Sequence, residues 1–268
     1  MQKRRKDSET AIIIFVKVPE SGFVKTRLTQ TTCLTEIDTA KIAEAMLKDT
    51  LILSSKSEAL NICIGFTPKN EQEKLENIIA SIEINQSSSN SFLFFSQTGS
   101  NFDERFTSII EAGFKANFRH LVILGADLPY LDPLFINYSF NRLSEIQKKE
   151  RIVIGPASGG GIYLVGITNN FNPGWFTEYN LFRGGVETSQ FVDLCKTKGL
   201  DMILLPPLID VDIEEDLVSL ITYIEAMESA AIYKNMHYPR FTADIIKELG
   251  IYIEKVPGET RNRKINKR

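Results

Sequence analysis

The stretch Ala-Ile-Ile-Ile-Phe-Val-Lys-Val-Pro-Glu-Ser-Gly-Phe-Val-Lys-Thr-Arg-Leu, residues 11–28, decides the fold. It opens with a continuous apolar run, which predicts a strand buried on both faces, and continues into a loop that contains glycine and cations. Six further short apolar runs follow it along the chain. The predicted strands are residues 11–18, 60–66, 92–95, 121–125, 152–155, 162–167 and 202–205.

Helix start signals lie between these runs. Thr35 precedes Asp38 by three residues, Asn101 precedes Glu104 by three, and Asp132 stands directly before a proline. Strands that alternate with helices predict parallel βαβ units, so we expect a three-layer α/β sandwich around a mostly parallel sheet. Such sheets bind ligands beyond the carboxyl ends of their strands.

We expect one domain, residues 11–231, because no internal repeat or linker interrupts this stretch. A basic disordered tail, residues 1–10, would precede it. A C-terminal helical appendage, residues 232–258, would follow it, with Thr242 as the cap of a helix. A second basic tail, residues 259–268, would end the chain.

Composition and charge exclude several classes of protein. The 268 residues are 43% hydrophobic and 24% charged, which is typical of a globular chain, and 31 Lys and Arg against 34 Asp and Glu give a net charge of −3. Nine of the 31 basic residues lie in the two short ends of the chain, so the body is more acidic than the total indicates and we expect no nucleic-acid partner. No apolar run approaches the roughly 20 residues of a membrane span, and no signal peptide is evident, so we expect a cytoplasmic protein. The composition does not indicate an oligomeric state.

Two histidines and three scattered cysteines leave little for a zinc site or a disulfide framework. A metal ion in this protein should therefore be a hard cation bound by carboxylates.

The loop after the first strand contains Lys17, Gly22, Lys25 and Arg27. Backbone amides and fixed cations at the end of a buried strand are suited to binding phosphates. The loop does not match a Walker A or a GxGxxG motif. Taken alone, it is also compatible with a surface loop whose cations are incidental.

Two later segments place carboxylates after apolar runs. Asp127 follows Leu-Val-Ile-Leu-Gly-Ala, where burial of a carboxylate is costly without a partner. Asp210 and Asp212 alternate in Asp-Val-Asp, so they should share one face, where two anions repel unless a cation compensates. We expect these residues to bind a divalent cation. A helix-cap or turn role for Asp127 stays open.

Three consecutive glycines, Gly159, Gly160 and Gly161, separate the fifth and sixth predicted strands. They predict either a hairpin turn or a close approach of the backbone to a ligand.

Five segments of the chain match, in the same order, the motifs of a known family. They are Lys17-x-Pro19-x-x-Gly22-x-Val24-Lys25-Thr26-Arg27-Leu28, Gln97-x-Gly99-x-Asn101-Phe102-x-Glu104-Arg105, Gly125-Ala126-Asp127-x-Pro129, the Gly-Pro-Ala…Gly-Gly stretch, and Leu204-Leu205-Pro206-Pro207…Asp210-Val211-Asp212…Glu215-Asp216-Leu217. From about residue 12 to residue 217 the chain thereby resembles the radical-SAM/selenodomain-associated transferases, often labelled arsenosugar-type glycosyltransferases. These belong to the GT-A or nucleotide-diphospho-sugar transferase superfamily, which implies a Rossmann-like, mixed and mostly parallel sheet.

The resemblance also implies roles for individual residues. Nucleotide would bind at the first loop and at the segment before the fourth strand, and Mg²⁺ or Mn²⁺ would bind at Asp127 with Asp210 or Asp212. Lys25, Arg27 and Asp127 would be catalytic. The implied nucleotide-binding residues are Lys17, Pro19, Gly22, Lys25, Arg27, Gln97, Gly99 and Arg105, and those on the acceptor side are Gly159, Gly160, Gly161, Arg183 and Glu187.

The chain differs from the family pattern on the acceptor side. Gly159 stands where the family usually has an aspartate, and a Phe182-Arg183-Gly184-Gly185 segment replaces the usual Trp-Ser-Thr. These differences leave the acceptor open.

Three functions follow as hypotheses. The first is nucleotidyl transfer from an NTP to a small phosphorylated or hydroxylated acceptor, with release of pyrophosphate against Lys25 and Arg27. The second is glycosyl transfer from a nucleotide-sugar, in which the same groups stabilise a departing nucleoside diphosphate. The third is a nucleotide-binding protein with impaired catalysis, motivated by Gly159.

Overall fold

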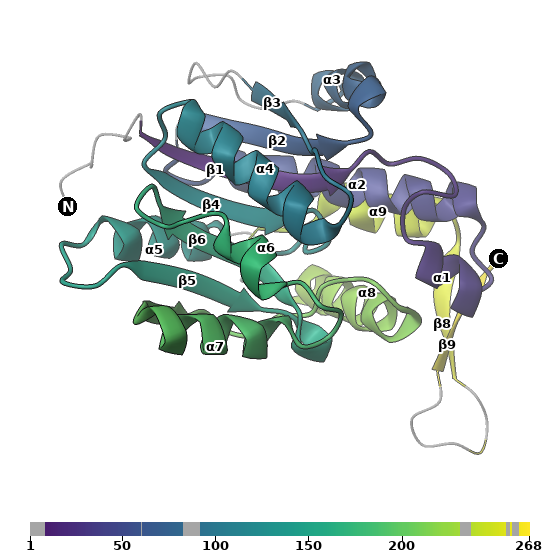
Figure 1. Cartoon of the computed structure of the whole chain (residues 1–268). Helices are drawn as coiled ribbons and strands as arrows, with labels where there is room; N and C mark the ends of the chain where they lie inside the picture. The colour runs from purple at the N-terminus through teal and green to yellow at the C-terminus, as the bar shows by residue number, and fades with distance from the viewer. Residues whose placement is uncertain (1–8, 60, 83–91, 231–236, 256–257, 259–262) are drawn as a thin grey trace.

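The protein is described by a computed structural model for residues 9–59, 61–82, 92–230, 237–255, 258 and 263–268. Its centre is a seven-stranded sheet with strand order β3-β2-β1-β4-β6-β5-β7 (Figure 1). Strand β6 runs antiparallel to both of its neighbours, and the other adjacent pairs are parallel. The strands are β1 Thr10–Lys17, β2 Asn61–Thr67, β3 Phe92–Ser96, β4 His120–Gly125, β5 Arg151–Pro156, β6 Ile162–Thr168 and β7 Asp201–Leu204.

These strands are the seven that the sequence predicts, with boundaries that agree to within one residue over the described part of the chain. The agreement has a physical cause. Strands such as β1 and β4 are buried on both faces, so they are continuous apolar runs that are easily recognised. The expected three-layer, mixed and mostly parallel α/β architecture is confirmed.

Helices cover both faces of the sheet (Figure 1). One face, with Ile12, Ile14 and Leu124, packs against helices α2, α3 and α5. The other face, with Ile13, Ile123 and Val165, packs against helices α4, α6 and α7. The helices are α1 Thr26–Thr31, α2 Glu36–Ser55, α3 Gln72–Ala80, α4 Phe102–Lys115, α5 Pro133–Ser144, α6 Trp175–Tyr179, α7 Glu187–Lys198, α8 Glu214–Ser229 and α9 Arg240–Glu248, with short 3-10 turns η1 Lys69–Glu71 and η2 Ser158–Gly160.

The predicted helix starts are largely correct. Thr35 and Asp38 form a capping box at α2, and Asp132 accepts a hydrogen bond from the Leu134 amide at α5. Asn101 caps α4 by accepting from the Glu104 amide. Thr242, in contrast, caps no helix, because α9 already begins at Arg240.

The C-terminal region corrects two expectations. Residues 232–258 include α9 but also strand β8 (Ile251–Lys255), and the expected basic tail includes strand β9 (Arg263–Lys267), which pairs antiparallel with β8. Ile251 and Ile265 are buried in a third apolar cluster against α8 and α9, so packing outweighs the charge of this segment. The expected N-terminal tail lies outside the described residues apart from positions 9 and 10, and Thr10 begins β1.

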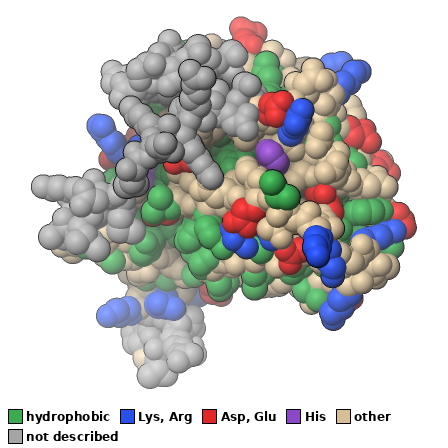
Figure 2. Space-filling model, turned by 90° about the vertical axis from the view of Figure 1, so that its left-hand side faces the viewer, with side chains coloured by type: hydrophobic (Ala, Val, Ile, Leu, Met, Phe, Trp, Pro, Cys, Tyr) green, Lys and Arg blue, Asp and Glu red, His purple; other side chains and the backbone are tan. Residues whose placement is uncertain are grey.

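The face where β1 begins, at the amino ends of the strands, carries interspersed acidic and basic side chains outside the grey atoms (Figure 2). No helix in the described ranges combines the length and the apolar character that a membrane crossing requires.

Candidate functional site

A cleft of about 600 Å³ lies at the carboxyl ends of β1 and β4, which are neighbours in the sheet. The chain leaves β1 toward β2 and β3 on one side and returns to form β4 on the other. The connections therefore diverge at this point and leave a crevice, which is where open α/β sheets bind ligands. The loop after β1, Asp127 after β4, and the segment before α8 line it.

Lys25 is the best-fixed cation of the cleft. Its backbone adopts the left-handed conformation, with φ of 50°, where it caps α1. Its side chain is only 6% exposed, and Nζ lies 2.5 Å from Asp127 Oδ1 and donates a hydrogen bond to the Val211 carbonyl. Such backbone conformations are costly for residues other than glycine, and they persist where surrounding contacts hold them. Lys25 thus joins the loop after β1 to Asp127 after β4 and to Val211 in the segment before α8.

Arg27 and Lys17 complete the basic side. The Arg27 guanidinium forms an ion pair with Asp212, and both side chains are well exposed. Lys17 is exposed at the end of β1 and lines the cleft. Pro19 is buried, and Gly22 turns the loop with φ of +80°, so these two residues shape the loop and do not line the cleft.

Asp127, Asp210 and Asp212 lie together although more than 80 residues separate the first from the others. The Val211 amide donates to the Asp127 carbonyl at 3.0 Å, which aligns the two segments. Val211 is buried, and the aspartates on either side of it both line the cleft, as the alternating pattern predicts. Burial raises the pKa of the Asp210 carboxyl; a hydrogen bond from Ser158 opposes this, and the charge of Asp127 raises the pKa further.

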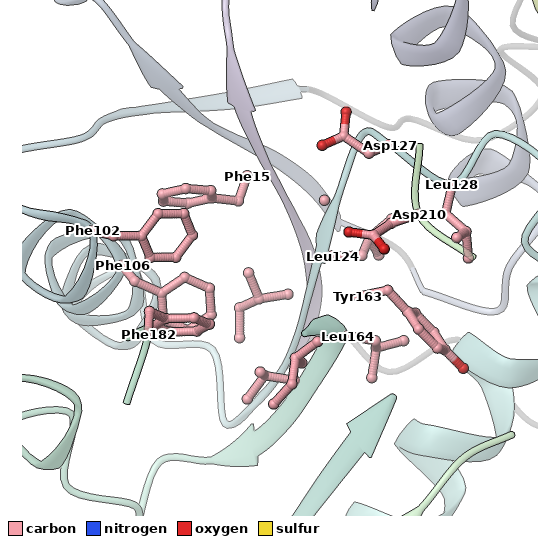
Figure 3. A pocket seen from close by; sticks show the side chains of 14 residues that line it. Phe15, Phe102, Phe106, Leu124, Asp127, Leu128, Tyr163, Leu164, Phe182 and Asp210 are labelled. Atoms are coloured by element: carbon pink, nitrogen blue, oxygen red, sulfur yellow. The ribbon is translucent and has the colours of Figure 1, made fainter. Parts of the chain in front are cut away.

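The donor set fits a magnesium-type ion. Asp127 and Asp210 face the same space (Figure 3), and the repulsion between them is the kind that a cation relieves. No cluster of three or more Asp, Glu, His or Cys side chains forms a metal-binding group among the described residues. Two carboxylates with substrate phosphates and water are a usual environment for Mg²⁺. Asp212 is paired with Arg27, as Asp127 is with Lys25.

The segment from Gln97 to Arg105 reaches the cleft through a residue other than those assigned to nucleotide binding. Gln97 is buried, and its side-chain amide donates to the carbonyls of Val16 and Gly65, so it joins the ends of neighbouring strands. Gly99 packs against the start of α4, where an added Cβ would lie 2.4 Å from Glu104 Cβ. Gln97, Gly99 and Arg105 do not line the cleft; Phe102, between them in sequence, does.

The glycine stretch forms a hairpin. Strands β5 and β6 pair antiparallel, and the Ala157 amide donates to the Gly161 carbonyl across the turn. Gly160 has φ of +88°, and an added Cβ would lie 2.6 Å from the Gly185 carbonyl oxygen. The close approach at Gly160 is therefore to another loop of the protein, and of the three glycines only Gly161 lines the cleft.

The loop before α7 closes the same side of the cleft. Glu187 lines the cleft and accepts a hydrogen bond from the Gly185 amide. Arg183 is exposed and does not line the cleft. Gly159 lies in open space, with no atom within 4 Å of an added Cβ.

Sequence reasoning missed the aromatic part of the site. Phe15, Phe102 and Phe182 line the cleft and also a smaller cavity of about 210 Å³ that opens beside Asp127 and Asp210 (Figure 3). It also missed Ser158, which donates to Asp210 at 3.0 Å. One signal was present: Phe102 directly follows the cap residue of α4, where an apolar side chain is not required for helix formation.

The comparisons with known proteins agree with this architecture. A family model described as an uncharacterized protein conserved in bacteria (DUF2064) matches residues 52–183. No curated protein matches the chain. A crystal structure from Desulfovibrio desulfuricans G20, of a protein described as a candidate nucleotide-diphospho-sugar transferase, is 24% identical, with a TM-score of 0.72 over 90% of this chain and 95% of that chain. A cytidylyltransferase from Leptospira borgpetersenii serovar Hardjo-bovis (strain JB197) is 16% identical, with a TM-score of 0.50 over 89% of this chain and 98% of that chain.

The two structural likenesses extend over nearly the whole chain and establish a shared fold with these solved structures. The association with radical-SAM or selenium enzymes stays a prediction from the motifs.

Proposed function

We propose that the protein is a metal-dependent nucleotidyltransferase that transfers a nucleotide from an NTP to a small acceptor. The observation that carries this proposal is the position of Lys25, a nearly buried cation held between Asp127 and Val211 at the carboxyl ends of β1 and β4. A fixed positive charge in a sheltered cleft is suited to stabilise a departing polyphosphate.

In the proposed reaction an acceptor oxygen forms a bond to the α-phosphorus of the NTP, and the bond from that phosphorus to the bridging oxygen breaks. Pyrophosphate leaves with the electron pair of the broken bond. The ammonium of Lys25 and the guanidinium of Arg27 now contact Asp127 and Asp212, and the phosphates would become their new partners. A phosphate acceptor needs no base, because its oxygen is already ionised.

Asp127 and Asp210 are the residues that would hold a divalent ion in this site. When bound, such an ion neutralises phosphate charge and orients the α-phosphate for in-line attack. Both carboxylates stand beside the cleft, and the Ser158 hydroxyl fixes Asp210 by a hydrogen bond.

A second candidate is glycosyl transfer from a nucleotide-sugar. The size of the cleft, about 600 Å³, and the fold shared with a candidate nucleotide-diphospho-sugar transferase favour it. In that reaction the same cations would meet a nucleoside diphosphate, and the bond broken is that between the anomeric carbon and the diphosphate oxygen.

The test is an assay that identifies the leaving group of the reaction. The protein is incubated with Mg²⁺, a small-molecule cell extract as the source of acceptors, and either an NTP labelled at the α-phosphate or a nucleotide-sugar labelled in the sugar. We expect label from the NTP to appear in a new product with equimolar pyrophosphate. Sugar transfer with nucleoside diphosphate release would replace this proposal by the second candidate.

The control variant is Asp127→Asn, in which turnover should be lost. Stabilisation of the wild type by nucleotides in thermal unfolding, without transfer from either donor class, would overturn both transferase proposals and favour a nucleotide-binding protein without catalysis.

A further inference from the structure

A hollow opens over Gly125 on the face of the sheet that α4 covers. Side chains alternate along a strand, so Gly125 shares this face with Ile123, and it pairs in register with Phe15 of β1. A Cβ added at Gly125 would meet nothing closer than the Asp127 amide nitrogen at 4.0 Å. Because glycine has no side chain, space is left at the end of a sheet that is otherwise tightly packed.

Phenylalanines form the wall on the other side of this space (Figure 3). The ring centroids of Phe102 and Phe182 lie 4.6 Å apart, and those of Phe106 and Phe182 lie 4.7 Å apart. Phe15 closes the row at 5.0 Å from Phe102. Phe102 is 39% exposed although it has apolar neighbours to pack against, so the wall ends at an opening.

The charged groups of this cavity lie at one end. Asp127 and Asp210 are the charged side chains that line it, and they stand apart from the phenylalanines, as Figure 3 shows. A ligand that is apolar at one end and carries a hydroxyl at the other matches this distribution, and so does one with a phosphate bridged by the divalent ion that the two carboxylates would hold. A nucleobase matches it less well, because its polar edge would face phenylalanine rings and lose its hydrogen bonds to water.

The volume limits what fits. The cavity measures about 210 Å³. An apolar protein cavity of roughly 150 Å³ accommodates benzene, so this one has room for a ring or a branched alkyl group of about six to ten non-hydrogen atoms. The neighbouring cleft of about 600 Å³ leaves separate space for the nucleotide.

We propose that the hollow over Gly125 binds a compact apolar group of the acceptor and so presents its hydroxyl or phosphate to Asp127 and Asp210. This inference rests on the proposed transferase function and names its acceptor class: a small alcohol or phosphate ester with a ring or branched apolar group. The phenylalanine wall would then select the acceptor, while the basic loop binds the donor.

The variant Gly125→Val tests this assignment, because it fills the hollow from a residue that does not line the nucleotide cleft. Binding of benzyl phosphate and of glycerol 3-phosphate, each with Mg²⁺, is measured by calorimetry on wild type and variant. We expect the wild type to prefer benzyl phosphate, and the variant to bind it about tenfold or more weakly because the added methyl groups occupy its place. Gly125→Ala provides a smaller change if the valine variant does not fold.

Leu134→Ala is the control, because Leu134 is an exposed apolar residue of α5 that lines neither the cleft nor the hollow. It should leave benzyl phosphate binding unchanged. Equal binding of the two phosphates to the wild type, or equal binding of benzyl phosphate to wild type and Gly125→Val, would overturn the inference.

Binding of each of the four ribonucleoside triphosphates with Mg²⁺ is measured on the same samples. If no triphosphate binds while benzyl phosphate binding still depends on residue 125, the proposed donor is wrong and the apolar site stands. If a triphosphate binds and benzyl phosphate does not, the transferase proposal stands and the acceptor class is wrong.

Discussion

Lys25 combines an unusual backbone with an unusual environment. Its left-handed conformation directs the side chain into the cleft, where the ammonium contacts Asp127 and the Val211 carbonyl. Alanine at this position would adopt the left-handed backbone conformation at a similar energetic cost, because both residues carry a Cβ. A substitution at this position therefore changes the charge in the cleft more than the shape of the loop.

We predict that Lys25→Ala lowers the rate of transfer by about 10²-fold or more, the scale for loss of one preorganised charge stabiliser. The measurement is kcat with the donor that the proposed assay identifies. Lys41→Ala is the control, since Lys41 makes an exposed ion pair with Glu248 far along the chain and should leave the rate unchanged. An unchanged rate in Lys25→Ala would contradict a role in the leaving-group step.

Individual residues show what a sequence can and cannot reveal about a site. Lys25, Arg27, Asp127, Asp210 and Asp212 follow predicted strands, and strand ends of one direction meet at one edge of the sheet, so their convergence was predictable. Gln97 follows a strand as well, yet its side chain turns back to bond strand carbonyls. The direction of a side chain depends on its neighbours in space, which the local sequence does not specify.

At the scale of elements, helix α9 is capped from outside its own sequence. Pro239 stands at its N-cap and provides no capping side chain. Asp49 of α2 supplies the missing acceptor: its carboxylate accepts from the amides of Phe241 and Thr242 and from the Thr242 hydroxyl, at 2.7–3.1 Å. Sequence reasoning assigned the cap to Thr242 because the true capping residue lies almost 200 positions earlier.

We predict that Asp49→Ala lowers the free energy of unfolding by about 2 kcal/mol or more, because it leaves two helix amides, one of them fully buried, and a buried hydroxyl without their acceptor. Denaturant unfolding at neutral pH measures the effect. The control is Asp244→Ala on the same helix, whose exposed pair with Arg240 should be worth less than about 0.5 kcal/mol. Equal losses in the two variants would show that Asp49 is not a cap.

Strands differ in how well their sequences reveal them. The seven strands of the main sheet were predictable because each is a nearly continuous apolar run. Strands β8 and β9 alternate single isoleucines with charged and polar residues, and Ile253 pairs with Ile265 across the hairpin. Their burial comes from α8 and α9, so only the packed molecule reveals them.

At the scale of the whole molecule, His237 joins the C-terminal region to the loop after β4 that bears Asp127. It is buried, with Nε2 2.8 Å from the carbonyl of Pro129, two residues after Asp127, and Nδ1 3.4 Å from Lys56 Nζ. Burial, followed by the charge of Lys56, lowers the pKa of His237 to about 4. In the unfolded chain the imidazole regains an ordinary pKa near 6.5.

Two buried groups therefore give opposite pH dependences. Between pH 6.5 and 4 the unfolded state binds a proton at His237 that the folded state does not, so this group lowers stability as the pH falls, by up to about 3 kcal/mol. Burial raises the pKa of Asp49 to about 6, against its hydrogen bonds. As the pH falls, Asp49 is protonated in the folded state before it is protonated in the unfolded state. Asp49 therefore raises the free energy of unfolding as the pH falls from 6 to 4.

We predict that His237→Gln, which keeps an N–H donor for Pro129, is more stable relative to the wild type at pH 4.5 than it is at pH 7. The difference in unfolding free energy between variant and wild type should change by about 2–3 kcal/mol between these two pH values. Urea unfolding at each pH measures it. The same difference at both pH values would show that His237 is not held neutral in the folded protein.

Strand β6 runs against the direction of the other strands in the sheet, so the turn that leads into it, residues 157–161, lies at the cleft beside the carboxyl ends of β1 and β4. This turn is a short local piece of chain, and each doubling of a loop costs only about 0.6 kcal/mol of closure entropy. Insertions there would remodel the rim of the cleft while the seven strands keep their register. A library that varies the length of this one turn would thus change the shape of the cleft on an unchanged scaffold.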